Sequence, residues 1–142
     1  MREVSLKLRD RIRELASFRC EYCLVPEHVT FAAHEIDHII SLKHHGESDE
    51  ENLALSCAQC NKHKGSDVGS IDPDTGKLVA LFHPRRDRWS DHFKVQDAAI
   101  VPKTAVGRVT VRLLQLNRTD RVQERAALIR AGMFASVSDP LE

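Results

Sequence analysis

The apolar positions near the N-terminus follow the spacing of an amphipathic helix. Leu8, Ile12 and Leu15 recur at intervals of four and three residues, and Arg and Lys residues crowd the opposite side. This pattern predicts a helix over residues 5–18 with one face turned toward a core. The predicted helix leads directly into Cys20, the first of the four cysteines in the chain.

The middle of the chain predicts two short strands followed by a helix. Residues 36–42 are mostly apolar and predict the first strand, and residues 53–55 predict the second. Ser48 and Glu51 have the spacing of a capping box, which predicts a short helical turn between the strands. A further helix is expected over residues 60–65, where a glycine ends it.

The C-terminal half predicts a hairpin and two helices. A turn-forming segment at residues 71–77, followed by an apolar segment at 78–82, is typical of a β-hairpin. Helical spacing recurs over residues 104–117 and 120–131. The apolar side of the last predicted helix consists of Val122, Ala126, Leu128 and Ile129. All these segments together indicate an α+β fold.

Length and charge exclude some classes of protein. The 142 residues, of which 42% are hydrophobic, suit one domain with its own core. Lys and Arg together number 21, as do Asp and Glu, so total charge does not argue for nucleic acid, although a local basic face can still bind it. No apolar run approaches the ~18 residues of a membrane span. The N-terminus lacks an apolar signal segment, and we expect a cytoplasmic protein without a membrane partner.

The cysteines are spaced as two identical pairs, Cys20 with Cys23 and Cys57 with Cys60. In a chain without a secretory segment, such Cys-x-x-Cys pairs favour a zinc site over disulfide bonds. Zinc takes four ligands in a tetrahedron, and the two pairs supply four thiolates. Four unrelated buried cysteines are the alternative, which the identical spacing of the pairs disfavours.

Three segments around these cysteines resemble the HNH nuclease family: Glu35–Ile39, Asn52–Leu55 and Cys57–Gly65. Members of that family fold as a ββα-metal (His-Me) finger and often carry the same zinc-binding cysteine pairs. Residues 71–73 and 83–90 and the predicted C-terminal helices also resemble those of a bacterial HNH subgroup.

The resemblance implies a single HNH nuclease domain over residues 1–142, with a core at 18–68 and a C-terminal extension at 69–135. It implies an N-terminal helix, a ββα-metal core with structural zinc, a β-hairpin and C-terminal helices. The implied activity is metal-dependent hydrolysis of phosphodiester bonds in DNA. The implied cofactors are structural Zn²⁺ and catalytic Mg²⁺ or Mn²⁺.

The resemblance places His38 at the first position of the motif, as the general base that activates water. A neutral imidazole suits this role because it titrates near working pH. Asn52 takes the middle position, which in the family bonds to the backbone and orients the loop that carries the base. Asp37 is the implied ligand of the catalytic ion, although strand alternation alone would turn Asp37 and His38 to opposite faces.

Asn61 takes the position of the final histidine, so the chain resembles the HNN variant of the family. Carboxylate and amide oxygens are ligands that Mg²⁺ prefers, which favours Asp37 and Asn61 as the ligand pair. His63 is the rival ligand and would favour a softer ion such as Mn²⁺ or Zn²⁺. Helical spacing turns residues 61 and 63 to different faces, which favours Asn61.

Candidate contacts to nucleic acid are the basic residues Lys62, Lys64, Arg85 and Arg86. An ordinary solvated charged face is the alternative for each of them. For the whole chain, the alternative is a non-catalytic zinc module that binds nucleic acid or protein and has no need of a base at His38. DNA is the preferred substrate, with RNA left open. A monomer would cut one strand, and a double-strand cut would need a dimer or two successive events.

Overall fold

The computed structural model describes residues 4–134, which divide into two compact units. The first unit contains the residues up to Val68 together with His83–Arg86, and the second contains Gly69–Phe82 and the residues from Asp87 onward. Helices and short antiparallel strands make up both units, so the predicted α+β class is confirmed. A single nuclease domain over the whole chain stays a prediction. Within the described residues, no helix has the length and apolar character needed to span a bilayer.

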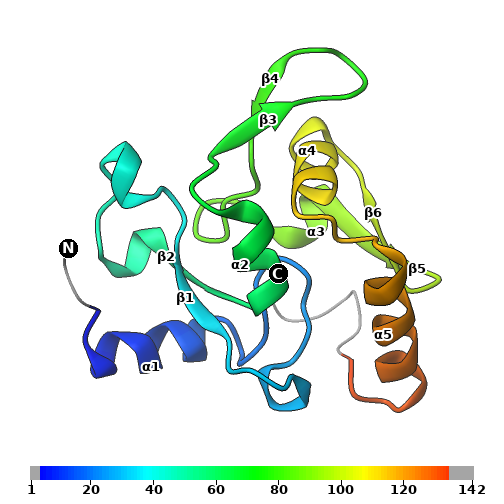
Figure 1. The fold of residues 1–142 in the computed structure, drawn as a ribbon, viewed down its shortest axis with the longest axis horizontal. Helices are drawn as coiled ribbons and strands as arrows, with labels where there is room; N and C mark the ends of the chain where they lie inside the picture. The colour runs from blue at the N-terminus through cyan, green and yellow to red at the C-terminus, as the bar shows by residue number, and fades with distance from the viewer. Residues whose placement is uncertain (1–3, 135–142) are drawn as a thin grey trace. The chain divides into compact units, whose positions relative to one another are not determined.

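The first unit is built around two antiparallel strands and a helix (Figure 1). Its elements are α1 (Leu6–Leu15), the 3-10 helix η1 (Glu27–Val29), β1 (Glu35–His38), the 3-10 helices η2 (Leu42–His44) and η3 (Glu50–Asn52), β2 (Leu53–Ser56) and α2 (Ala58–Lys64). In the β1–β2 pair, Asp37 lies opposite Ala54 and His38 lies opposite Leu53. The predicted order of strand, turn, strand and helix is confirmed, but β1 is shorter than predicted and ends at His38.

The apolar face of α1 packs against β2 and forms the core of this unit. The fully buried members of this core are Ile12, Ala16, Leu53 and Leu55. Leu8 and Leu15 pack against them, as the helical spacing predicts. The helix ends at Leu15, earlier than predicted. Ser17 and Phe18 take left-handed backbone angles, with φ of 54° and 58°, which a right-handed helix excludes.

Among its described residues, the second unit contains two β-hairpins and three helices. Its elements are β3 (Gly69–Ile71), β4 (Leu78–Ala80), α3 (Trp89–His92), β5 (Phe93–Gln96), β6 (Ala99–Pro102), α4 (Ala105–Leu113) and α5 (Thr119–Arg130). The β3–β4 hairpin and the two long helices are confirmed. The β5–β6 hairpin was not predicted, because its two-residue turn is Asp97–Ala98. Both residues have positive φ, 51° and 66°, and Ala98 occupies the position where such turns normally contain Gly.

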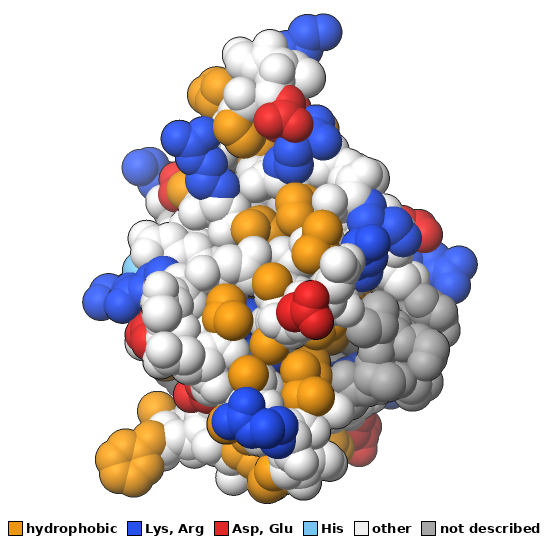
Figure 2. Space-filling model, turned by 90° about the vertical axis from the view of Figure 1, so that its right-hand side faces the viewer, with side chains coloured by type: hydrophobic (Ala, Val, Ile, Leu, Met, Phe, Trp, Pro, Cys, Tyr) orange, Lys and Arg blue, Asp and Glu red, His pale blue; other side chains and the backbone are white. Residues whose placement is uncertain are grey.

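Helix α5 packs through two arginines. Arg121 donates to the C=O of Leu114 at 3.1 Å, and Arg125 donates to the C=O groups of Ala98 at 2.7 Å and Leu116 at 2.9 Å. These backbone acceptors offset the cost of burying the guanidinium groups. Figure 2 turns the right-hand side of Figure 1 toward the viewer and shows hydrophobic side chains on that face. The predicted apolar side of α5 is partly open to solvent, because Ile129 is exposed and Val122, Ala126 and Leu128 are half-buried.

Candidate functional site

Four cysteine thiols meet inside the first unit, those of Cys20, Cys23, Cys57 and Cys60. All four side chains are buried, and their Sγ atoms lie within 4.8 Å of one another. A tetrahedral zinc ion with Zn–S bonds of about 2.3 Å separates its sulfurs by about 3.8 Å. The Sγ atoms of Cys23 and Cys57 lie 3.7 Å apart. The four cysteines are therefore placed to hold a zinc ion, as predicted.

Each cysteine pair lies in a turn whose backbone N–H groups point at a sulfur. Tyr22 and Cys23 donate to Cys20 Sγ at 3.4 and 3.5 Å, and Cys60 donates to Cys57 Sγ at 3.4 Å at the start of α2. Such donors stabilise a thiolate. Burial raises the pKa of the Cys20 and Cys60 thiols well above the usual range. A metal ion that binds them must therefore displace their protons.

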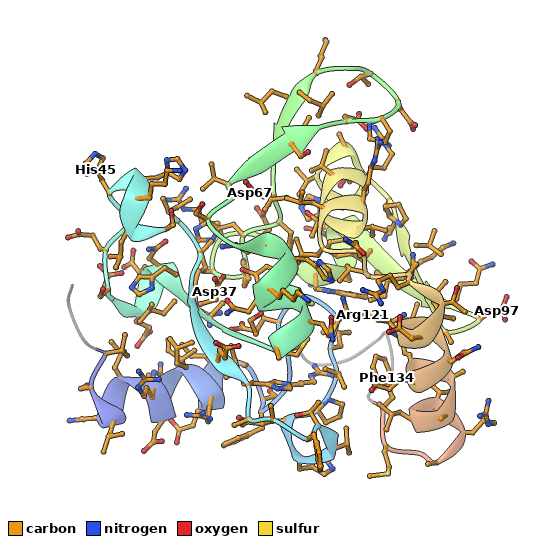
Figure 3. All side chains as sticks on the ribbon, in the orientation of Figure 1. Asp37, His45, Asp67, Asp97, Arg121 and Phe134 are labelled. Atoms are coloured by element: carbon orange, nitrogen blue, oxygen red, sulfur yellow. The ribbon has the colours of Figure 1, made fainter. Side chains whose placement is uncertain are left out.

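A hollow of about 330 Å³ lies in the first unit beside β1 and α2. It is lined by Ile36, Asp37, His38, Ser41, Leu42, Lys43, Asn61, Gly65 and Ser66. The hollow thus brings together the predicted base, His38, and both preferred metal ligands, Asp37 and Asn61. Figure 3 labels Asp37 on β1, next to α2. Strand alternation does not separate Asp37 from His38 here, because β1 ends at His38 and both residues border the hollow.

Three polar residues of the hollow were not predicted to belong to the site: Ser41, Lys43 and Ser66. Ser41 and Lys43 follow β1 closely in sequence, and Ser66 follows α2. Their closeness in sequence to His38 and Asn61 was the available signal. His63 is not among the residues that line the hollow. Asn61 and His63 are thus separated in the way that helical spacing predicts.

The His38 ring contacts a loop residue. Its Nε2 atom lies 2.9 Å from Ser48 Oγ. When Nε2 carries the ring proton and donates it to Ser48, Nδ1 is left as the basic nitrogen. Ser48 was predicted to cap a helical turn, and this is wrong. The residue before η3 is Asp49, and its side chain makes no capping hydrogen bond.

Asn52 holds the loop that follows His38. Its Oδ1 accepts from the N–H of Ile40 at 2.8 Å, and its Nδ2 donates to the C=O groups of Ile40 at 2.9 Å and Glu47 at 2.8 Å. The loop passes so close to itself that a Cβ atom at Gly46 would lie 1.7 Å from the Ile40 oxygen. Only glycine fits at this position.

Asp37 is nearly fully buried and accepts from two buried donors. Tyr22 donates its hydroxyl to Oδ2 at 2.9 Å, and Lys64 Nζ lies 3.1 Å from Oδ2 and 3.3 Å from Oδ1. Burial raises the pKa of Asp37, while the positive charge of Lys64 opposes this rise. Burial likewise raises the pKa of Tyr22, so its hydroxyl stays a donor. Tyr22 was not predicted to belong to the site, although its position between Cys20 and Cys23 was an available signal.

Two of the four basic residues predicted to contact nucleic acid are unsuited to that role. The side chain of Lys64 is 1% exposed and is paired with Asp37. Arg85 donates through Nη1 and Nη2 to both carboxylate oxygens of Glu21, at 2.7 and 2.6 Å. These pairs occupy the cationic groups, which argues against contact with nucleic acid by Lys64 and Arg85. Lys62 and Arg86 are exposed and stay candidates.

Comparison with known proteins points to the same segment. The HNH endonuclease family matches residues 20–67, which contain both cysteine pairs, β1, β2 and α2. This segment is an HNH domain. The chain that carries it is also similar to two longer proteins. Septu protein PtuA of Bacillus mycoides (strain KBAB4) is 36% identical over 90 residues, which cover 56% of this chain and 13% of PtuA.

Septu protein PtuB of Bacillus thuringiensis is 26% identical over 131 residues, which cover 91% of this chain and 48% of PtuB. The chain that carries the HNH domain therefore spans less than half the length of either relative. No solved structure matches the chain significantly.

Proposed function

We propose that this chain is a metal-dependent endonuclease that hydrolyses phosphodiester bonds in DNA. The observation that carries the proposal is the hollow in the HNH domain, which Asp37, His38 and Asn61 line together. Phosphodiester hydrolysis requires an activated water and stabilisation of the charge on the phosphate and the leaving oxygen. These three side chains supply a base and two oxygen donors to the hollow.

The donor set of the hollow fits a hard divalent cation. Asp37 contributes a carboxylate and Asn61 contributes an amide oxygen, the ligand types that Mg²⁺ and Mn²⁺ accept. A carboxylate offers about four acceptor positions, and Tyr22 and Lys64 occupy three on Asp37. One position on Oδ1 is left for a cation. When bound, such an ion stabilises negative charge on the phosphate and on the leaving oxygen.

The remaining residues prepare the substrate and the base. His38 takes a proton from water through Nδ1 when Nε2 donates to Ser48, 2.9 Å away. Asn52 keeps the loop between His38 and Ser48 in place through its bonds to Ile40 and Glu47. Lys43, at the edge of the hollow, is a candidate phosphate contact.

Further from the hollow, the exposed Lys62 and Arg86 are additional candidates for contact with the DNA backbone. The four buried cysteines hold Zn²⁺ in a structural role. We place the activity in the cytoplasm, where cysteines stay reduced and available to zinc. One site cuts one strand, so a monomer nicks DNA and a double-strand cut requires a second copy or a second event.

The similarity to the PtuA and PtuB proteins supports a place for this chain in a Septu system. A single observation favours a second function, a non-catalytic zinc module. Asp37 is buried and paired with Lys64, as a purely structural carboxylate would be. The hollow that Asp37 and His38 share favours the enzyme over this alternative.

The test is nicking of supercoiled plasmid by the full chain in Mg²⁺, Mn²⁺ or EDTA. The variant His38→Ala should lose nicking by at least about a hundredfold, the scale of general-base catalysis. His28→Ala is the matched control, because His28 is an exposed residue of η1 outside the hollow. Nicking that survives in His38→Ala would remove the assigned base. No cleavage of DNA or RNA by the wild type would favour the zinc module.

A further inference from the structure

Asp37, which lines the hollow, forms a hydrogen-bonded cluster with Tyr22 and Lys64. Tyr22 is 0% exposed, and the side chains of Asp37 and Lys64 are 5% and 1% exposed. A buried ammonium or carboxylate is costly unless it is paired and hydrogen-bonded. The cluster satisfies this requirement, because both donors meet the same carboxylate. Such a fully satisfied cluster holds each of its members in one orientation.

The arrangement of the donors determines which carboxylate oxygen of Asp37 can still bind a cation. Oδ2 accepts from Tyr22 at 2.9 Å and lies 3.1 Å from Lys64 Nζ. Oδ1 lies 3.3 Å from the same Nζ atom and has one acceptor position left. Rotation of the carboxylate would break the bond from Tyr22. The hydroxyl of Tyr22 therefore selects Oδ1 as the oxygen that can take a cation.

Lys64 ties the carboxylate to the backbone of the proposed base. Its Nζ atom donates to the C=O of His38 at 3.1 Å as well as to Asp37. Lys64 is the last residue of α2 and lies three residues after Asn61 on that helix. The same lysine thus connects the end of β1, with Asp37 and His38, to the helix that carries the second ligand.

Tyr22 connects the cluster to the cysteine site. It lies between Cys20 and Cys23, and its backbone N–H donates to Cys20 Sγ at 3.4 Å. The position of the phenol therefore depends on the turn that the first cysteine pair forms. A change in that turn would move the Tyr22 hydroxyl, which donates directly to Asp37 Oδ2 at 2.9 Å.

We propose that Tyr22 and Lys64 are positioning residues that hold Asp37 with Oδ1 toward the divalent ion, and that Tyr22 makes binding of this ion depend on the zinc turn. The inference rests on the proposed function, in which Asp37 is a ligand of the catalytic ion. It assigns the turn formed by Cys20–Cys23 a role in orienting Asp37, in addition to its role in stabilising the fold. Partners of this kind typically change metal affinity by ~10–100-fold.

The decisive variant is Tyr22→Phe, which removes one hydroxyl and no charge. Binding of Mn²⁺ is measured by electron paramagnetic resonance of the free ion, on full-length zinc-loaded protein without nucleic acid. We expect Tyr22→Phe to keep its zinc and to bind Mn²⁺ about tenfold more weakly. Thr30→Val is the matched control. It removes a hydroxyl that donates to the C=O of Glu27 at 2.9 Å, outside the hollow. Equal Mn²⁺ affinity in Tyr22→Phe and wild type would overturn the role of Tyr22.

Lys64→Met is the second variant, and its outcome separates positioning from charge. Loss of a cation next to Asp37 would by itself strengthen Mn²⁺ binding. We expect weaker binding, because the carboxylate and the His38 backbone lose their shared donor. Tighter binding would show that Lys64 competes with the ion and would overturn its positioning role. Lys7→Met, at an exposed position of α1, is the control for loss of a lysine.

The wild type separates failure of this inference from failure of the proposed function. If the wild type neither binds Mn²⁺ nor nicks plasmid, the metal-dependent nuclease proposal fails, and the positioning proposal fails with it. If the wild type does both and the two variants match it in Mn²⁺ affinity, only the positioning proposal fails. Zinc content, measured on every sample, shows whether a variant still has an intact cysteine site.

Discussion

The side chain of Asn52 pairs with both backbone groups of Ile40, accepting from its N–H at 2.8 Å and donating to its C=O at 2.9 Å. In the second unit, Asn117 makes the same pair of bonds to Ile100, at 2.9 and 2.8 Å. The two asparagines thus do the same structural work, but only Asn52 holds a loop beside His38. This likeness provides a control for the first prediction.

We expect Asn52→Ala to lower the free energy of unfolding by about 3 kcal/mol, because it removes three hydrogen bonds made by a buried side chain. It should also reduce nicking strongly, because the loop between His38 and Ser48 loses its support. Asn117→Ala should cost about 1 kcal/mol and leave nicking unchanged, since Asn117 is exposed and outside the hollow. Urea unfolding and plasmid nicking measure both effects. Equal activity of the two variants would contradict the role of Asn52.

Arg85 and Arg86 are adjacent in sequence but should behave differently. Arg85→Ala leaves the buried carboxylate of Glu21 without its charged partner and should cost about 3 kcal/mol of stability. Arg86→Ala should change stability by less than about 0.5 kcal/mol. It should instead reduce the salt dependence of DNA binding by about one phosphate contact. Urea unfolding and fluorescence anisotropy across salt concentrations test this. A stable Arg85→Ala protein with weakened DNA binding would show that Arg85 contacts DNA after all.

Cys57→Ser should abolish zinc binding and unfold the first unit, because the free energy of zinc binding contributes directly to folding. Zinc content and far-UV circular dichroism measure the two effects. Zinc binding to the wild type should release protons and weaken as the pH falls, since burial raises the pKa of the Cys20 and Cys60 thiols. A zinc-free wild type with an unchanged melting temperature would refute the structural role.

The pair of Asp72 and Arg108 should make the second unit sensitive to acid. Arg108 donates through Nε and Nη2 to both oxygens of Asp72, each at 2.9 Å, and holds the pKa of Asp72 well below its usual range. A lowered pKa contributes stability above the unfolded value of about 3.9, and this contribution is lost as the pH falls through the folded value. The melting temperatures of wild type and Arg108→Gln should therefore differ by a constant amount above about pH 5 and converge below about pH 4. A difference that grows in acid would contradict the assignment.

Local sequence features predicted the cysteine cluster and the order of elements. The four cysteines that can hold zinc followed from two Cys-x-x-Cys turns, because residues this close in sequence form one ligand pair in any fold that includes the turn. The strand–strand–helix order followed from apolar spacing, and Gly65 ended α2 as expected. Asp37, His38 and Asn61 instead followed from the resemblance to the HNH family, which places them on the first strand and on the helix, where β1 and α2 contain them.

Only the tertiary structure decided which charged groups face solvent. Lys64 and Arg85 looked like surface cations, but their partners lie 27 and 64 residues away in the sequence. Arg121 and Arg125 are buried against backbone carbonyls, whereas the apolar spacing of α5 pointed to another face. Ser48 faces His38 instead of capping a helix. The burial of a side chain and its hydrogen-bond partners depend on contacts between segments that are distant in sequence. The pattern of residues along one segment therefore does not predict them.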